Sequence, residues 1–124
     1  MRKINSYLYQ SKNDTIKKRS SSGGAFYDLA EKAIKRQYYV SGCVWDSKLE
    51  AKHTVSNTLE DVQRMQGSKY VQSEMGETYK IIISLLQKDE KVLFSGTPCQ
   101  ASAVGKLASK INKRHNLLSV AIVC

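Results

Sequence analysis

The stretch Val92–Gln100, which reads Val-Leu-Phe-Ser-Gly-Thr-Pro-Cys-Gln, decides how this chain folds. Its first four residues are apolar or small and predict a short buried strand, which Gly96 ends. Thr97 is a favourable helix N-cap, and Pro98 suits the first helical position because the N–H that proline lacks would be unpaired there. Apolar residues then recur at helical spacing. The stretch therefore predicts a strand-to-helix turn of an α/β protein, with Cys99 in the first helical turn.

Two interpretations of Cys99 follow from this position. Ligands of α/β proteins bind at the carboxyl ends of strands, beside the unpaired N–H groups of a helix N-terminus. Cys99 would then belong to a binding site. The alternative is a strand-to-helix turn whose cysteine is only a small buried residue, which is common for free cysteines. The spacing alone favours neither interpretation.

Strand-like and helix-like patterns alternate along the rest of the chain, with a turn over Trp45–Glu50. They predict strands at Ile4–Gln10, Tyr38–Val44, Ala51–Ser56 and Leu117–Cys124, a loop at Ser11–Arg19, and helices after Gly24 and over Thr58–Gln66, Glu77–Lys88 and Pro98–Asn112. The last strand is a continuous apolar run, typical of a strand buried on both faces. We therefore expect a mixed, partly parallel sheet flanked by helices, with a C-terminal βαβ unit, in a truncated domain.

Length and composition limit the class of protein. A chain of 124 residues with 41% hydrophobic and 25% charged residues forms one globular domain. No apolar run approaches the roughly 20 residues of a membrane span, and no signal peptide follows Met1, so we expect a cytoplasmic protein. Three widely spaced cysteines do not predict a disulfide framework and are one fewer than a four-cysteine iron–sulfur site needs.

The formal charge of +9 favours an anionic partner, such as a phosphorylated cofactor, a nucleic acid or an acidic protein surface. Nucleic acid is the least favoured of these, because no recognisable module is present and the tyrosines are scattered. Lys17–Arg19 directly precede the loop Ser20–Gly24, whose small residues before a helix suit a phosphate. An ordinary capped helix is the alternative there. The stretch Gly67–Ser73 combines a lysine with hydroxyl and amide groups, as in a ligand-binding loop or a plain turn.

These stretches occur in a distinctive order. Ser-Ser-Ser-Gly-Gly opens a helix, Gly-Ser-Lys-Tyr-Val-Gln-Ser follows, the stretch around Cys99 comes next, and Ser-Val-Ala-Ile-Val-Cys closes the chain. From Ile4 to Cys124, the chain resembles the coenzyme F-420 hydrogenase/dehydrogenase beta-subunit family, which includes 7-hydroxymethyl chlorophyll a reductase. Members are flavin (FAD) and iron–sulfur oxidoreductases. The ferredoxin-like cysteines that precede this part in many members, and the His-Gly-Val-Pro segment that follows it, are absent here.

The resemblance implies that residues 1–124 are the flavin-binding N-terminal half of such an oxidoreductase, inactive alone. It implies three groups of cofactor-binding residues, which are Ser22, Gly23 and Gly24, then Lys69, Tyr70, Gln72 and Ser73, then Thr97 and Gln100. It also implies that Cys99 and Cys124 ligate a [4Fe–4S] cluster, whereas Cys43 matches no motif and is expected to be a buried strand residue. No catalytic residue is assigned. A deazaflavin, ferredoxin and other oxidoreductase subunits or domains are the implied partners, and the alternative is a catalytically silent module that binds a nucleotide or a partner.

Overall fold

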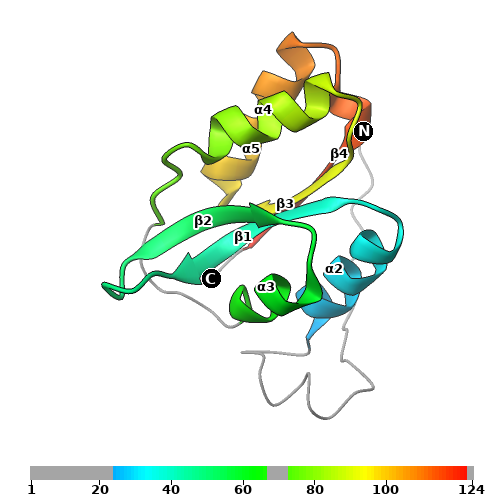
Figure 1. Ribbon diagram of the computed structural model, residues 1–124. Helices are drawn as coiled ribbons and strands as arrows, with labels where there is room; N and C mark the ends of the chain where they lie inside the picture. Colours follow the sequence, from blue (N-terminus) through cyan, green and yellow to red (C-terminus); the bar gives the residue numbers. More distant parts are fainter. Residues whose placement is uncertain (1–23, 67–72, 123–124) are drawn as a thin grey trace, which may run out of the picture.

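The computed structural model describes residues 24–66 and 73–122 of the chain. In these residues a four-stranded sheet carries helices on both faces (Figure 1). The strands are β1 (Tyr39–Trp45), β2 (Ala51–Ser56), β3 (Val92–Gly96) and β4 (Leu117–Ala121). The helices are α2 (Ala25–Lys35), α3 (Leu59–Arg64), α4 (Thr78–Gln87) and α5 (Pro98–Lys110), and a short 3-10 turn, η1 (Arg114–Asn116), precedes β4.

The sheet has the strand order β2-β1-β3-β4. Strands β1, β3 and β4 are parallel, and β2 pairs with β1 as an antiparallel hairpin. This confirms the predicted α/β class and the βαβ unit, which is β3–α5–β4. Gly96 pairs with Ala121, and the N–H of Ile122 donates to the Gly96 carbonyl oxygen at 2.7 Å. Strands β3 and β4 therefore end at the same edge of the sheet, which we call the carboxyl edge.

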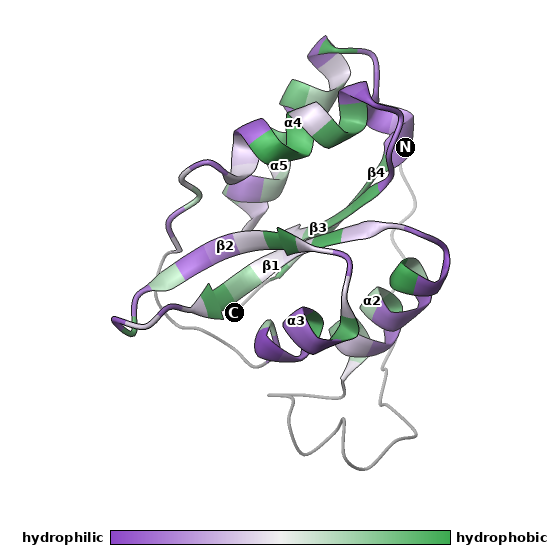
Figure 2. Ribbon diagram, viewed as in Figure 1, coloured by the Kyte–Doolittle hydropathy of each residue, from purple (hydrophilic) through white to green (hydrophobic). Residues whose placement is uncertain are grey.

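Each face of the sheet has its own hydrophobic core because successive residues of a strand point to opposite faces. Leu93 packs with residues of α2 and α3 on one face, whereas Val92 and Phe94 pack with residues of α4 and α5 on the other. All five residues of β3 are buried, as expected for an inner strand covered on both faces. Figure 2 shows β3 and β4 mostly in the hydrophobic colour, whereas β2 and the turn between β1 and β2 include hydrophilic stretches.

The helix boundaries follow local chemistry that the sequence displays. Helix α2 begins directly after Gly24, whose φ of 83° favours glycine. Thr58 is the N-cap of α3, and its hydroxyl oxygen accepts the N–H of Asp61 at 3.3 Å. None of the described helices is both long and apolar enough to cross a membrane.

Two expectations about burial are wrong. Strand β4 is not buried on both faces, since Leu118 is 44% exposed. It is the last strand of the described sheet, and α2 and α3 pack mainly on β1, with Val120 of β4 at the margin of their core. Cys43 is half-buried rather than buried, because it lies near the end of β1 at the open carboxyl edge. The predicted strand Ile4–Gln10 and loop Ser11–Arg19 lie outside the described residues.

Candidate functional site

The turn from β3 into α5 lies at the carboxyl edge and is fixed by a capping box. The Thr97 hydroxyl oxygen accepts the N–H of Gln100 at 3.2 Å, and the Gln100 side-chain oxygen accepts the N–H of Thr97 at 3.0 Å. Pro98 occupies the first helical turn, as predicted. Two backbone donors that the helix cannot pair internally are satisfied in this way. The exposed residues Thr97, Pro98 and Cys99 then form the outer surface of the turn.

Gly96 allows the side chain of Gln100 to fold back over the end of β3. A Cβ atom at this position would lie 2.7 Å from the Gln100 side-chain oxygen and 3.0 Å from the Phe94 ring. The glycine is therefore required by close approach of two side chains rather than by its backbone conformation.

A chain of hydrogen bonds joins this turn to two other segments. The Gln100 amide nitrogen donates to the Ser73 hydroxyl oxygen at 3.0 Å, and that hydroxyl lies 2.6 Å from Nδ1 of His53. Nε2 of His53 lies 2.8 Å from the carbonyl oxygen of Ser95. Ser73 and Gln100, which come from two of the stretches that carry the resemblance, are thus in direct contact.

The donor and acceptor of each of these hydrogen bonds can be assigned by starting from the Ser95 carbonyl. A carbonyl oxygen only accepts, so Nε2 of His53 carries the proton and Nδ1 of the neutral ring accepts. The Ser73 hydroxyl therefore donates to Nδ1, and its oxygen receives the Gln100 amide. Burial lowers the pKa of His53 from its ordinary value, against the raising effect of the bond to Ser95. The lowered pKa and the hydrogen-bond geometry therefore both indicate a neutral His53 ring.

His53 is a site residue that the sequence reasoning did not identify. It lies on β2, pairs in register with Cys43 of β1, and stacks on Phe94 with ring centroids 5.3 Å apart and 20° between the planes. A signal was present in the sequence. Alternation along the predicted strand Ala51–Ser56 places His53 on the same face as Ala51 and Val55, which is the inward face.

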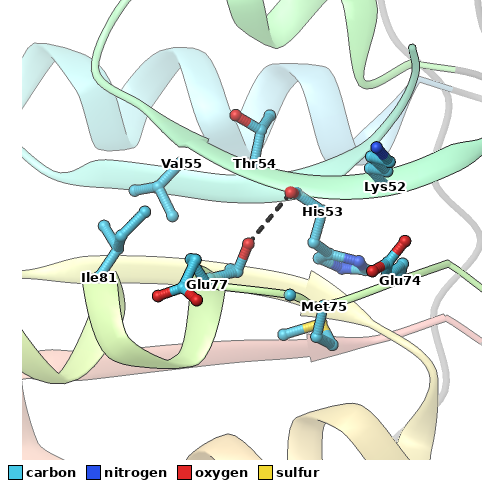
Figure 3. A pocket seen from close by; sticks show the side chains of 10 residues that line it. Lys52, His53, Thr54, Val55, Glu74, Met75, Glu77 and Ile81 are labelled. Carbon is cyan, nitrogen blue, oxygen red and sulfur yellow. Dashed lines mark hydrogen bonds between the residues drawn. The ribbon is translucent and has the colours of Figure 1, made fainter.

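The segment that carries Ser73 is tied to the edge of β2. The N–H of His53 donates to the Glu74 carbonyl oxygen and the N–H of Glu74 to that of Ala51, both at 2.9 Å. The Thr78 hydroxyl donates to the His53 carbonyl oxygen at 3.0 Å (Figure 3). These bonds fix the backbone on either side of the chain of polar side chains, so Ser73 has a defined position.

A cavity of about 320 Å³ opens beside this segment, between β2 and the start of α4 (Figure 3). Its lining is mixed, with Lys52, Glu74 and Glu77 alongside the apolar Val55 and Ile81. Two carboxylates against one ammonium group do not suit a phosphate. Of the hydrogen-bonded residues Gln100, Ser73, His53 and Ser95, the lining contains only His53. The cavity is therefore not the predicted cofactor site.

The cysteines give no metal centre within the described residues. Cys99 is exposed in the first turn of α5, and Cys43 lies on β1. In residues 24–66 and 73–122, no three histidine, cysteine or acidic side chains come close enough to hold a metal ion. Cys124 lies outside these residues. Ile122, the residue that follows β4, does lie beside Gly96 at the carboxyl edge.

The other predicted site residues divide into two groups. Gly24 is described and lies at the start of α2, on the opposite face of the sheet from α5. The residues outside the described part of the chain are Ser22, Gly23, Lys69, Tyr70 and Gln72. The structure thus brings together Ser73, Thr97 and Gln100.

Comparison with known proteins gives a likeness of fold. No protein-family model and no curated protein matches the chain. A solved structure of the F420-reducing [NiFe] hydrogenase complex from Methanosarcina barkeri, determined in a xenon-derivatization study, contains a chain that superimposes with a TM-score of 0.71 at 23% identity. The match covers 95% of this chain and 44% of that chain, so this chain spans less than half of its length.

Proposed function

We propose that this chain is the flavin-binding part of an oxidoreductase that transfers hydride or electrons between FAD and a redox partner such as a deazaflavin or ferredoxin. One observation carries the proposal. Ser73 and Gln100, which are 27 residues apart and belong to separate flavin-associated stretches of the resembled family, are hydrogen-bonded at 3.0 Å. Their contact is what a shared cofactor site would require, and it supports the proposal.

The turn from β3 into α5 has features that suit FAD. Helix α5 has 13 residues, and the aligned peptide dipoles of a helix of this length give its N-terminus a partial positive charge. This charge favours an anion such as the FAD pyrophosphate. Thr97 and Cys99 are exposed there, so the Thr97 hydroxyl and the Cys99 N–H are the groups that would meet the cofactor. The net charge of +9 favours the same anionic ligand. When bound, FAD supplies hydride acceptance at its ring, and this chain's residues bind and orient it.

The similarity of fold supports a redox role for this chain, and the complete reaction would need further parts of a larger protein or complex. The solved neighbour belongs to a complex whose printed name is that of an F420-reducing hydrogenase, and this chain corresponds to less than half of the matching chain. We therefore propose that residues 1–124 act as one half of a larger catalytic unit, together with other oxidoreductase subunits or domains.

A [4Fe–4S] cluster held in part by Cys99 and Cys124 belongs to the proposal, but the described residues hold no three-ligand group that would support it. We therefore derive no electron-transfer step through it. In the full-length protein, Cys99→Ser and Cys124→Ser should each lower the iron content, whereas Cys43→Ser should leave it unchanged. Equal iron in all three variants would remove the cluster from the proposal.

The flavin proposal is tested by adding FAD to the purified protein and recording the absorbance of the fraction that remains bound after desalting. The expected result is bound flavin in the wild type and at least about tenfold weaker affinity in Lys69→Ala, because a charge-assisted hydrogen bond to the cofactor is lost. Lys106→Ala, on the exposed side of α5, is the matched control and should bind as the wild type does. A protein that stays colourless would contradict the proposal and favour the silent binding module.

A further inference from the structure

His53 connects three separate segments through one imidazole ring. The ring belongs to β2, its Nδ1 meets Ser73 in the segment before α4, and its Nε2 meets the Ser95 carbonyl in β3. The residues in contact are 20 and 42 positions away in the sequence. The ring also stacks on Phe94, which is fully buried. With both nitrogens and one ring face engaged, His53 has little freedom to reorient.

Charged groups near His53 leave its neutral state undisturbed. Lys52, the preceding residue, is paired with Asp46 at 3.0 Å. Glu74 meets His53 through its backbone carbonyl, and Cys43 is the cross-strand neighbour. Because Ser73 and Ser95 occupy the two ring nitrogens, a carboxylate has no ring nitrogen left to stabilise an imidazolium. The remaining contacts, from Phe94 and through Ser73 from Gln100, are uncharged.

We propose that His53 is a positioning residue of the candidate site at the carboxyl edge, whose neutral ring orients the Ser73 hydroxyl and, through it, the Gln100 side chain. The identity of the ligand as FAD rests on the proposed function above. Nδ1 accepts a hydrogen bond from the Ser73 hydroxyl, which fixes the orientation of that hydroxyl, and the Ser73 oxygen receives the Gln100 amide while the Gln100 oxygen accepts the N–H of Thr97. The donors therefore follow one another from Gln100 of α5 through Ser73 and His53 to the Ser95 carbonyl of β3, and the tautomer of His53 determines this order.

Protonation of the ring would reverse this direction at Ser73. An imidazolium donates from both nitrogens, so Ser73 would have to accept from His53 and turn its own proton elsewhere. Both acceptor positions of the Ser73 oxygen would then be taken, one by the Gln100 amide and one by His53, and the hydroxyl proton would need a new acceptor. We therefore expect this arrangement of hydrogen bonds to hold at neutral pH, and ligand binding to weaken as the pH falls below the range in which His53 is neutral.

Two conservative variants separate positioning from a general structural role. An asparagine can place its oxygen near the position of Nδ1 and still accept from Ser73, whereas a glutamine can place its nitrogen near Nε2 and still donate to Ser95. In FAD titrations followed by flavin fluorescence between pH 5 and 8, His53→Asn should bind within about threefold of the wild type and lose its pH dependence. His53→Gln should bind about tenfold more weakly at neutral pH. Equal affinities in the two variants would overturn the proposal.

A second measurement does not depend on FAD. Nitrogen NMR of the wild-type imidazole should show a neutral His53 with its proton on Nε2 at pH 6.5. The side-chain amide signals of Gln100 should shift in His53→Gln and stay in place in His53→Asn. An Nδ1–H tautomer or a charged ring would refute the positioning role whatever the ligand. If these signals are as expected and FAD does not bind, the proposed function fails while the role of His53 stands.

If His53→Gln does not fold, Ser73→Ala removes the same link from the other side. It leaves the ring and its bond to Ser95 intact, and it should weaken FAD binding by a similar factor. It should also shift the Gln100 amide signals. Unchanged binding and unchanged Gln100 signals in Ser73→Ala would overturn the proposal.

Discussion

Gly96→Ala should destabilise the protein and disturb the candidate site at the same time. The added Cβ would lie 2.7 Å from the Gln100 side-chain oxygen and 3.0 Å from two atoms of the Phe94 ring. A glutamine side chain end usually moves away at little cost. Here it is held by the capping box with Thr97 and by its amide bond to Ser73. Phe94 is fully buried, and its ring stacks on His53.

The expected loss follows from these contacts. Giving up the hydrogen bond between Gln100 and Thr97 costs about 0.5–1.5 kcal/mol of the free energy of unfolding. Overpacking against Phe94 costs about 1–3 kcal/mol more. Lower entropy of the unfolded chain, which alanine brings relative to glycine, returns about 0.4–1 kcal/mol. The net destabilisation should therefore be about 0.5–4 kcal/mol.

Urea unfolding followed by circular dichroism measures this difference, and Gly105→Ala is the matched control. A Cβ at Gly105, inside α5, would meet only Arg114 Nε at 3.7 Å, an ordinary contact. Alanine in a helix interior should stabilise the protein by about 0.5–1 kcal/mol. The two substitutions, nine positions apart and chemically identical, should thus have opposite signs. A Gly96→Ala protein as stable as the wild type would refute the claim that Gln100 is pinned over the end of β3.

Three further predictions use the same unfolding assay. Thr97→Ala should lower the free energy of unfolding by about 1 kcal/mol, and Thr97→Ser should lower it much less because serine retains the capping oxygen. Equal losses in the two variants would contradict the role of Thr97 as N-cap. The pKa of His53 is lowered from 6.5 by burial, so its neutral form contributes stability that is present above that pH and lost as the pH falls. His53→Asn should flatten the stability profile between about pH 6.5 and 5, and an unchanged slope would contradict this. Leu86 is fully buried, and Leu86→Ala should lower the free energy of unfolding by about 2–5 kcal/mol. Ile81 is 45% exposed, and Ile81→Ala should lower it far less. Similar losses in the two variants would contradict the assignment of Leu86 to the buried face of α4.

The parts of the site that the sequence predicts are those fixed by neighbours along the chain. Thr97, Pro98 and Gln100 make their capping contacts within one helical turn, so residue types and spacing were enough to predict the turn. The parallel βαβ unit followed in the same way from the alternation of apolar patterns. Local chemistry of this kind does not depend on how the sheet is assembled.

The rest depends on contacts between distant segments. His53 meets Ser95 only because β2 pairs with β1 and β1 pairs with β3, and the register of β1 with β3 joins segments that are distant in the sequence. The exposure of Leu118 likewise depends on what lies beside β4, and its apolar sequence says nothing of that neighbour. The contact between Ser73 and Gln100 could be expected only from the resemblance, not from spacing.

The central claim is that an anionic flavin binds at the carboxyl edge, over the turn from β3 into α5. Amide NMR spectra of the protein, recorded while FAD is added, test the claim most directly. We expect saturable shifts at Ser73 and at Gly96, Cys99 and Gln100, with no change at Lys110 near the far end of α5. Shifts that are absent, or that spread over basic residues such as Lys110 without saturating, would contradict the account.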